Sequence, residues 1–369
     1  MTYPNLRFSR ADQADFFRTL NNRVNEYFQQ NDIKKYGNWK LYLKSAVVFA
    51  FLLTPYFLIL SNNFNQWVML LLTVMIGTGA SFVGMCVMHD GNHGSFSSRQ
   101  WVNNLMGSSI YFLAGNVYNW KVQHNILHHT YTNIIEHDDD IRTDGLIRLH
   151  KEDKWRRFHK YQHYYSIFLY GLLTLNWVLR KDYRQMRDYM QQGFNFGKKI
   201  NVTRQWTILI LTKAIYALIW IVIPILILNI AWWKVMIGFV VMHYTSGIIL
   251  SVVFQLAHIV EDAQMPAPAE GGTMENTWAI HQLCTTANFA PKNKLVSWFV
   301  GGLNFQIEHH IFPHISHVHY PKISKIVKAT ALEFGLPYIE YSTTRKAILS
   351  HFRMLRELGR GPAALAAGA

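Results

Sequence analysis

Three short histidine clusters are the residues of this chain best suited to chemistry. They are HDGNH at 89–93, HNILHH at 124–129 and QIEHH at 306–310. Residues four apart share one face of a helix, so the two histidines of the first cluster, and likewise His124 and His128, should point the same way. His129 would lie about 100° further round the helix. Imidazoles that converge from several helices commonly bind transition metals, so we predict a metal site.

The number of histidines predicts two metal ions. Eight of the 18 histidines belong to the clusters or end a long apolar run: His89, His93, His124, His128, His129, His258, His309 and His310. A structural zinc ion takes about four ligands, so eight exceed what one ion can use. Imidazole binds zinc, copper, nickel and iron alike. We favour iron, because two redox metals beside a membrane suit the activation of O2 on a lipid substrate.

Acidic residues near the clusters are candidates to support the metal ligands. A metal-bound histidine usually donates its second ring nitrogen to a carboxylate or a carbonyl. The acids close in sequence are Asp90, Asp138, Asp139, Glu261, Asp262 and Glu308. Each of them taken alone is as well explained as a solvated surface acid.

Four apolar runs must position these clusters. Half of the chain is hydrophobic and only 16% is charged, which is low for a soluble protein. Each run has close to the roughly 20 residues that cross a bilayer as a helix. The predicted spans are about 44–61, 67–88, 206–230 and 232–257. We therefore predict an all-α integral membrane protein, with two transmembrane hairpins and a helical cytosolic cap that holds the histidines.

The distribution of charge predicts the orientation in the membrane. The formal net charge is +14, but Lys and Arg flank the apolar runs and do not form the compact arm of a nucleic-acid-binding protein. They are frequent between the second and third runs and almost absent from the links at 61–66 and 231–234. Positive residues stay on the cytosolic side, so both termini and the central segment should be cytosolic.

The chain divides into three predicted parts. Residues 1–40 form an amphipathic helical segment, 41–358 the membrane domain, and 359–369 a low-complexity tail without a functional role. Phe16, Leu20 and Val24 have helical spacing in the first part. A helix on the membrane surface and a helix packed on the protein body explain this pattern equally well.

The clusters and runs together strongly resemble the membrane fatty acid desaturase superfamily, whose three histidine boxes occur in this order around two helical hairpins. The third box, FQIEHHIFPHISHVHYPKI at 305–323, begins with glutamine as in the front-end branch, which includes bacterial linoleoyl-CoA-type enzymes. The resemblance implies a di-iron enzyme in a bacterial inner membrane. Such an enzyme uses O2 and two electrons to remove two hydrogens from a fatty acyl chain, which leaves a cis double bond and water.

The same resemblance implies a ligand set. The matching ligands are the two histidines of the first box, the three of the second, the two of the third, and His258 after the last membrane helix. Gln306 stands where other branches have histidine. Direct coordination, a water bridge and an open position are therefore all consistent with the glutamine.

The resemblance also implies the partners of the enzyme. Many front-end relatives carry a fused haem domain with an HPGG signature, which is absent from this sequence. We therefore expect a separate electron donor, such as a ferredoxin or a cytochrome-b-type protein, and a fatty acyl substrate on CoA or a lipid.

A lipid or alkane hydroxylase of the same superfamily is the chemical alternative. A non-catalytic metal-binding membrane protein or transporter is the alternative from another class, although transport sites usually lie near the bilayer midplane.

Overall fold

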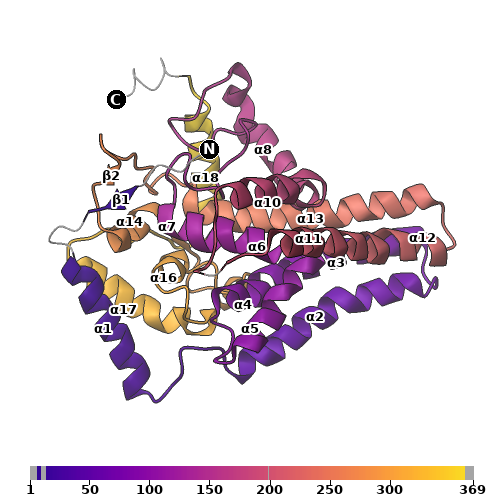
Figure 1. Ribbon diagram of the computed structural model, residues 1–369, viewed down its shortest axis with the longest axis horizontal. Helices are drawn as coiled ribbons and strands as arrows, with labels where there is room; N and C mark the ends of the chain where they lie inside the picture. Colours follow the sequence, from indigo (N-terminus) through magenta and orange to yellow (C-terminus); the bar gives the residue numbers. More distant parts are fainter. Residues whose placement is uncertain (1–5, 10–13, 198, 362–369) are drawn as a thin grey trace. The chain divides into compact units, whose positions relative to one another are not determined.

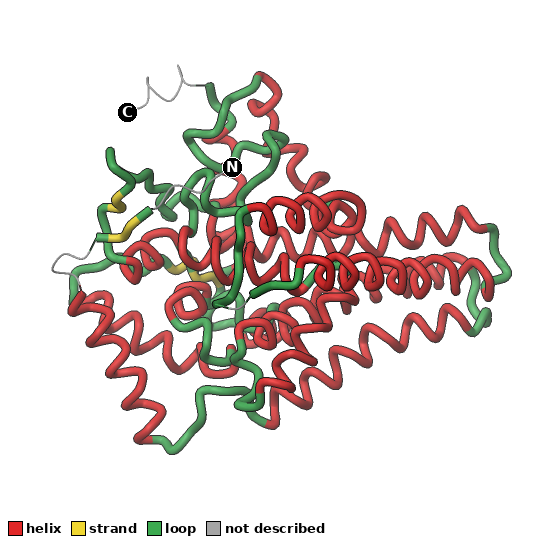
Figure 2. The backbone as a smooth tube through the Cα atoms, viewed as in Figure 1, coloured by secondary structure: helices red, strands yellow, loops and turns green. Residues whose placement is uncertain are grey.

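The protein is described by a computed structural model that covers residues 6–9, 14–197 and 199–361. The described chain is mostly helical, with a few two-residue strands (Figure 2). Its internal contacts divide it into two compact units. The first unit contains residues 38–122 and 167–252, and the second contains the chain up to residue 37, residues 123–166 and the chain from residue 253 onward.

Four helical segments are long and apolar enough to cross a membrane, which confirms the prediction of four spans in two hairpins. The first hairpin pairs α2 (Trp39–Leu60) with α3 (Gln66–Val83), and α3 continues through the π-helix η1 (Gly84–Met88) into α4 (His89–His93). The second hairpin pairs a span at 202–227 with α13 (Trp232–His258). The segments of the 202–227 span are α11 (Val202–Ala217), η6 (Leu218–Val222) and α12 (Ile223–Ile227).

Asparagine caps set where three of these helices begin. Asn38, Asn65 and Asn201 each accept hydrogen bonds from backbone N–H groups of the first helical turn. Such caps satisfy donors that have no partner within the helix. Consequently α2 and α11 begin several residues before the apolar runs that were predicted to start at 44 and 206.

The helices of the first unit approach each other closely at glycines of α3. A Cβ atom on Gly77 would lie 2.4 Å from the Met242 carbonyl oxygen of α13, and one on Gly79 would lie 2.8 Å from Leu52 Cα of α2. Small residues at helix contacts allow this approach, which is common in membrane bundles. The other helices that begin in this unit are α5 (Gln100–Gly107), η2 (Ser108–Leu113), α6 (Val117–Trp120), η3 (Lys121–His128), α9 (Leu173–Asn176), η5 (Trp177–Lys181) and α10 (Asp182–Gln191).

The second unit is built from short helices around a small apolar core. Its elements are β1 (Arg7–Phe8), α1 (Ala14–Gln30), α7 (His129–Tyr131), η4 (Arg157–Tyr161), α8 (Gln162–Gly171), β2 (Thr273–Met274), α14 (Trp278–Thr285), β3 (Asn288–Phe289), α15 (Lys294–Phe299), α16 (Gln306–Ile311), η7 (His317–His319), α17 (Tyr320–Glu333), β4 (Glu340–Tyr341) and α18 (Thr344–Leu358). The chain passes between the two units within η3, α8 and α13. Strand β1 pairs in parallel with β2, and β3 pairs in parallel with β4.

Helix α1 packs on the protein body, so the second interpretation of the N-terminal helix is the correct one. Helix α1 lies beside α17 (Figure 1). Its apolar residues Phe16 and Leu20 are almost fully buried in one core with Ile323 of α17. Arg23 donates two hydrogen bonds to the Glu333 carboxylate of α17, at 2.6 and 3.0 Å. The face that could have entered a lipid surface is therefore used within the unit.

The predicted C-terminal tail starts at residue 359, and only residues 359–361 of it lie within the described part of the structure. Gly359 caps α18, and the Trp155 indole N–H donates to the Gly359 carbonyl at 2.9 Å. Residues 362–369, which make up most of the predicted tail, lie outside the described residues.

Candidate metal centre

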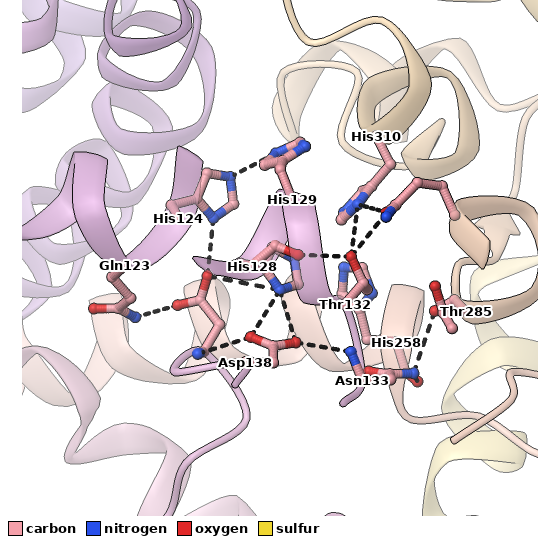
Figure 3. Close-up of polar contacts among 12 residues, drawn as sticks. Gln123, His124, His128, His129, Thr132, Asn133, Asp138, His258, Thr285 and His310 are labelled. Atoms are coloured by element: carbon pink, nitrogen blue, oxygen red, sulfur yellow. Dashed lines mark hydrogen bonds and ion pairs between the residues drawn. The ribbon is translucent and has the colours of Figure 1, made fainter. Parts of the chain in front are cut away.

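Six of the predicted histidine ligands come together in the second unit. His124 and His128 lie on η3, His129 begins α7, His258 ends α13, and His309 and His310 lie on α16. Figure 3 shows His124, His128, His129, His258 and His310 gathered together. One ring nitrogen each of His128, His258 and His310 lies within 4.8 Å of the others. The same is true of His129, His309 and His310. The two groups share His310, so they form one continuous cluster.

Two aspartates orient the imidazoles of the second cluster. The His128 Nδ1 atom lies 3.0 Å from both Asp138 carboxylate oxygens, and the His124 Nδ1 atom lies 2.9 Å from Asp140 Oδ2. A carboxylate favours the proton on the nitrogen that faces it, which leaves the Nε2 lone pair of each ring directed into the cluster.

Neutral groups hold the third cluster in the same way. The His310 Nδ1 atom lies 2.9 Å from Gln282 Oε1, and the His309 Nδ1 atom lies 3.2 Å from the Tyr320 hydroxyl. Gln282 is itself held by the Thr132 hydroxyl, which donates to its Oε1 atom at 2.8 Å. Four of the six imidazoles therefore have Nδ1 occupied and present Nε2 to the cluster.

The second cluster lies on a π-helix, which changes the predicted arrangement of His129. The i→i+5 hydrogen bonds of a π-helix widen each turn, and such turns are frequent at functional sites. The ring centroids of His124 and His128 are 5.1 Å apart, and those of His124 and His129 are 4.8 Å apart. The expectation that His129 turns away by an α-helical angle was wrong, because both rings flank His124.

Electrostatics keep most of this cluster neutral. Burial lowers the pKa of His124 more than Asp140 raises it, and burial with the neighbouring histidines holds the pKa of His310 well below its usual range. For His128 burial again lowers the pKa, but Asp138 and Asp140 together outweigh this effect and the net change is upward. Neutral imidazole is the form that binds a metal ion.

The donor set fits transition metals. Among the described residues, the Nε2 atoms of His128 and His310 are buried and have no hydrogen-bond partner. A buried nitrogen without a partner costs free energy, which a bound metal ion would offset. Two overlapping groups of three histidines, each with carboxylate or amide support, match the chemistry of an imidazole-bound metal pair.

Comparison with known proteins decides the family. The fatty acid desaturase family model matches residues 65–342. The chain is 34% identical to an sn-1 linoleoyl-lipid 6-desaturase of Arthrospira platensis, over 98% of this chain and 97% of the relative. It is 33% identical to a protein of the same name from Synechocystis, over 96% and 98%, and 33% identical to an acyl-lipid (8-3)-desaturase of Physcomitrium patens, over 96% and 74%.

The chain belongs to the fatty acid desaturase family. The resemblance drawn from the histidine boxes is confirmed, and the protein is a membrane-bound fatty acyl desaturase, an oxidoreductase of lipid metabolism.

The first histidine box of this desaturase lies in the first unit, on α4. The ring centroids of His89 and His93 are 4.6 Å apart, as their i, i+4 spacing predicts. Both rings contact the edge or face of Trp120, at centroid distances of 5.7 and 5.5 Å. Asp90 is buried between them, and its backbone carbonyl accepts a hydrogen bond from the Ser95 N–H at 2.9 Å.

Three other candidate acids of the desaturase make contacts that differ from those of Asp138. Asp139 lies 3.6 Å from Arg142, and Asp262 accepts a hydrogen bond from the Tyr341 hydroxyl at 2.6 Å. Glu261 lies 3.7 Å from Arg353 near the surface. Each of these three contacts joins the acid to a residue outside the histidine boxes.

Glu308 and Gln306 are buried on α16 beside the third-box histidines. Glu308 accepts hydrogen bonds from Asn288 Nδ2 at 2.8 Å and from the Tyr338 hydroxyl at 2.9 Å. Burial raises the pKa of Glu308 to about 7. The contacts of Glu308 tie α16 to the segments that carry β3 and β4.

Sequence reasoning missed three residues that orient the ligands, namely Asp140, Gln282 and Tyr320. Asp140 closes the run HDDD at 137–140, so the run was recognisable although its last member was not selected. Gln282 lies 28 residues before His310, and Tyr320 lies 11 residues after His309. Both residue types are common in helices, so neither attracted attention. Their roles appear only when α14, α16 and α17 are packed together.

Proposed function

We propose that this desaturase holds two iron ions and removes two hydrogens from an acyl chain of a lipid, on the carboxyl side of an existing double bond. The proposed ligands are His89, His93, His124, His128, His129, His258, His309 and His310. The observation that carries the proposal is the cluster of six histidines in the second unit, in which two groups of three share His310. The first-box histidines are added by their place in the family pattern.

The irons, when bound, would supply the activation of O2 that side chains cannot achieve. The side chains around the histidine boxes would orient the histidine rings. Asp138 and Asp140 would hold the Nδ1 protons of the second box, so that its Nε2 atoms face the metal. Gln282 and Tyr320 would do the same for the third box without adding negative charge. Gln306 would occupy the histidine position of other branches, as a direct ligand, through a water molecule or beside an open position.

The names of the relatives support a front-end acyl-lipid substrate. Two of them are linoleoyl-lipid 6-desaturases that match nearly the whole chain, and a third is an acyl-lipid (8-3)-desaturase. The glutamine that begins the third box supports the same branch. We therefore favour an acyl lipid over acyl-CoA for this chain.

The proposed setting is a bacterial inner membrane with both termini in the cytosol. An even number of spans supports termini on one side, and the Lys- and Arg-rich segment between the hairpins supports the cytosolic side. A separate ferredoxin or cytochrome-b-type protein would supply electrons. The basic surface would favour an acidic donor.

The test is mass spectrometry of fatty acids from host membranes that express the chain and are fed saturated and unsaturated acids. The matched control is the His310→Ala variant. We expect a histidine-dependent product that is lighter by two hydrogen atoms, with the new double bond on the carboxyl side of an existing one. A product heavier by one oxygen atom would support the hydroxylase alternative. Bound iron without any O2-dependent product would support the non-catalytic alternative.

A further inference from the structure

A cavity lined by both polar and apolar side chains lies beside the first histidine box within the first unit. Its volume is about 350 Å³, which falls within the usual range for ligand pockets. The cavity is lined by residues of α4, α5, η2, α6, the start of η3 and the beginning of α11, and by Phe196 and Ile200. Asn92, one of its lining residues, belongs to the HDGNH box itself. The cavity therefore borders the segment that carries the first-box ligands.

Asn116 is a lining residue of this cavity, and its side chain carries a buried donor. Its side-chain oxygen caps α6 by accepting a hydrogen bond from the Asn119 N–H at 3.1 Å. Its Nδ2 group is buried and has no hydrogen-bond partner among the described residues, and the side chain is only 1% exposed. Buried donors in native proteins nearly always have a partner, so this one indicates a ligand that carries an acceptor oxygen.

Lys121 supplies the cavity with its cation. It makes no ion pair or side-chain hydrogen bond that involves the described residues, and burial lowers its pKa. The other polar lining groups are amides and hydroxyls, and no carboxylate from the described chain lines the cavity. One cation among neutral groups suits carbonyl and hydroxyl oxygens, whereas the several phosphates of CoA would need several cations.

Front-end chemistry requires the carboxyl end of the substrate to lie close to the histidine boxes. An extended chain advances roughly 1.2 Å per bond, since a three-bond residue of polypeptide spans 3.3–3.6 Å. The few bonds between the ester carbonyl and a front-end double bond therefore span only several ångströms. A site for the ester must accordingly adjoin a histidine box, as this cavity does.

We propose that this cavity binds the ester end of an acyl lipid, with Asn116 Nδ2 and Lys121 donating to the ester carbonyl and the neighbouring oxygens of a glycerolipid. This inference rests on the proposed function and names the part of the substrate that the cavity recognises. An ester held at this site would fix the number of carbon atoms between the carboxyl end and the new double bond. The apolar residues Phe196 and Ile200 would cover the first carbons of the chain.

The experiment compares the full-length wild type with Asn116→Asp, Lys121→Met and the control Asn65→Asp, all purified in detergent. Aspartate can still cap α6 but carries no N–H group, so Asn116→Asp removes the donor and keeps the cap. Asn65 is likewise a helix cap, on α3, and does not line the cavity. The substrate probes are dilinoleoylglycerol and linoleoyl-CoA, each supplied with O2 and with reduced ferredoxin as the electron donor. The readouts are KM, kcat, bound iron and the double-bond position.

The wild type should prefer dilinoleoylglycerol. Asn116→Asp and Lys121→Met should each raise the KM for this probe at least tenfold and spread the product over neighbouring double-bond positions. Their bound iron should equal that of the wild type. The control Asn65→Asp should match the wild type in KM, kcat and double-bond position. A preference for linoleoyl-CoA, or a wild-type KM and double-bond position in Asn116→Asp, would overturn the inference. A wild type that forms no double bond in either probe would instead contradict the proposed function.

Discussion

At the scale of the residue, the two ring nitrogens of a box histidine have different contacts. In His128 the Nδ1 atom faces Asp138, and the buried Nε2 atom has no hydrogen-bond partner within the described chain. Buried ring nitrogens usually have hydrogen-bond partners, whereas a ring nitrogen of His128 lies within 4.8 Å of ring nitrogens of His258 and His310. The asymmetry therefore supports a ligand role, which the presence of a histidine in a motif could not do alone.

Replacing His128 with alanine should remove bound iron and desaturation together, because a buried ligand is lost while the membrane helices are untouched. Iron can be measured per protein chain by elemental analysis, and insertion by extraction of the washed membrane. His314→Ala is the matched control, since His314 follows the third box but is exposed and stands outside the histidine groups. Normal iron content in His128→Ala would exclude this residue as a ligand.

Neutralising Asp138 should weaken iron binding by about 10–100-fold, the usual effect of removing the partner of a metal-bound histidine. Asp138→Asn keeps the shape of the side chain but no longer stabilises the Nδ1 proton of His128. Asp139→Asn is the control, because that carboxylate lies 3.6 Å from Arg142. Iron retention during titration with a chelator measures the difference. Equal retention in the two variants would contradict the assigned role of Asp138.

At the scale of the element, π-helical turns accompany both of the first two histidine boxes. η1 directly precedes His89, and η3 contains His124 and His128. The wider turn of η3 allows residues four and five positions after His124 to approach its ring together. An α-helix would have separated them, so the local backbone geometry decides how many imidazoles one turn can contribute.

A buried ion pair joins α11 to two neighbouring elements of the first unit. Lys213 Nζ lies 2.7 Å from Asp182 Oδ2 and donates to the Trp177 carbonyl at 2.8 Å and to the Ala114 carbonyl. Both side chains of the pair are almost completely buried. The lysine therefore connects the third span with η5, α10 and the loop that leads to α6.

Lys213→Met should destabilise the protein by about 3–5 kcal/mol, the usual cost of leaving one charge of a buried pair uncompensated. Adding Asp182→Asn should restore part of this loss, because the buried carboxylate is then neutral. Thermal unfolding in detergent, followed by tryptophan fluorescence, measures both effects. A double variant that is less stable than Lys213→Met would contradict the ion-pair explanation.

At the scale of the whole molecule, three buried histidines outside the membrane spans link stability to pH. Burial lowers the pKa of His150, His281 and His351 to about 4 in each case. An unfolded histidine takes up a proton near pH 6.5, whereas these folded ones do so only near pH 4. Unfolding therefore consumes protons in this range, and the folded state loses stability as the pH falls from 6.5 towards 4.

Each of these histidines should lower the free energy of unfolding by on the order of 1 kcal/mol for every pH unit below about 6.5. His351→Asn tests this expectation, because asparagine cannot titrate but can donate to the Ile259 carbonyl, as the His351 Nδ1 group does at 2.8 Å. The loss of thermal stability between pH 7.5 and 5.5 should be smaller in the variant than in the wild type. An identical loss would show that His351 does not contribute.

Local patterns were sufficient to predict the four candidate membrane spans and most of the histidine cluster. The length of an apolar run and the spacing of histidines along one helix are properties of neighbouring residues, so the four spans and the pairing of His89 with His93 could be predicted. Helix starts were less predictable, because the capping residues Asn38 and Asn201 precede the apolar runs.

Only the tertiary structure decided which groups support the ligands and where a substrate head could bind. Gln282, Tyr320 and Asp140 contact histidines on other elements or across a loop, and Asn116, whose buried donor has no partner among the described residues, lines a cavity built from several helices. These relations depend on how separate helices and loops pack together, which the spacing of residues along one helix does not show. The sequence by itself therefore determined the apolar spans and the histidine clusters, while packing determined the orientation of the imidazoles and the shape of the cavity.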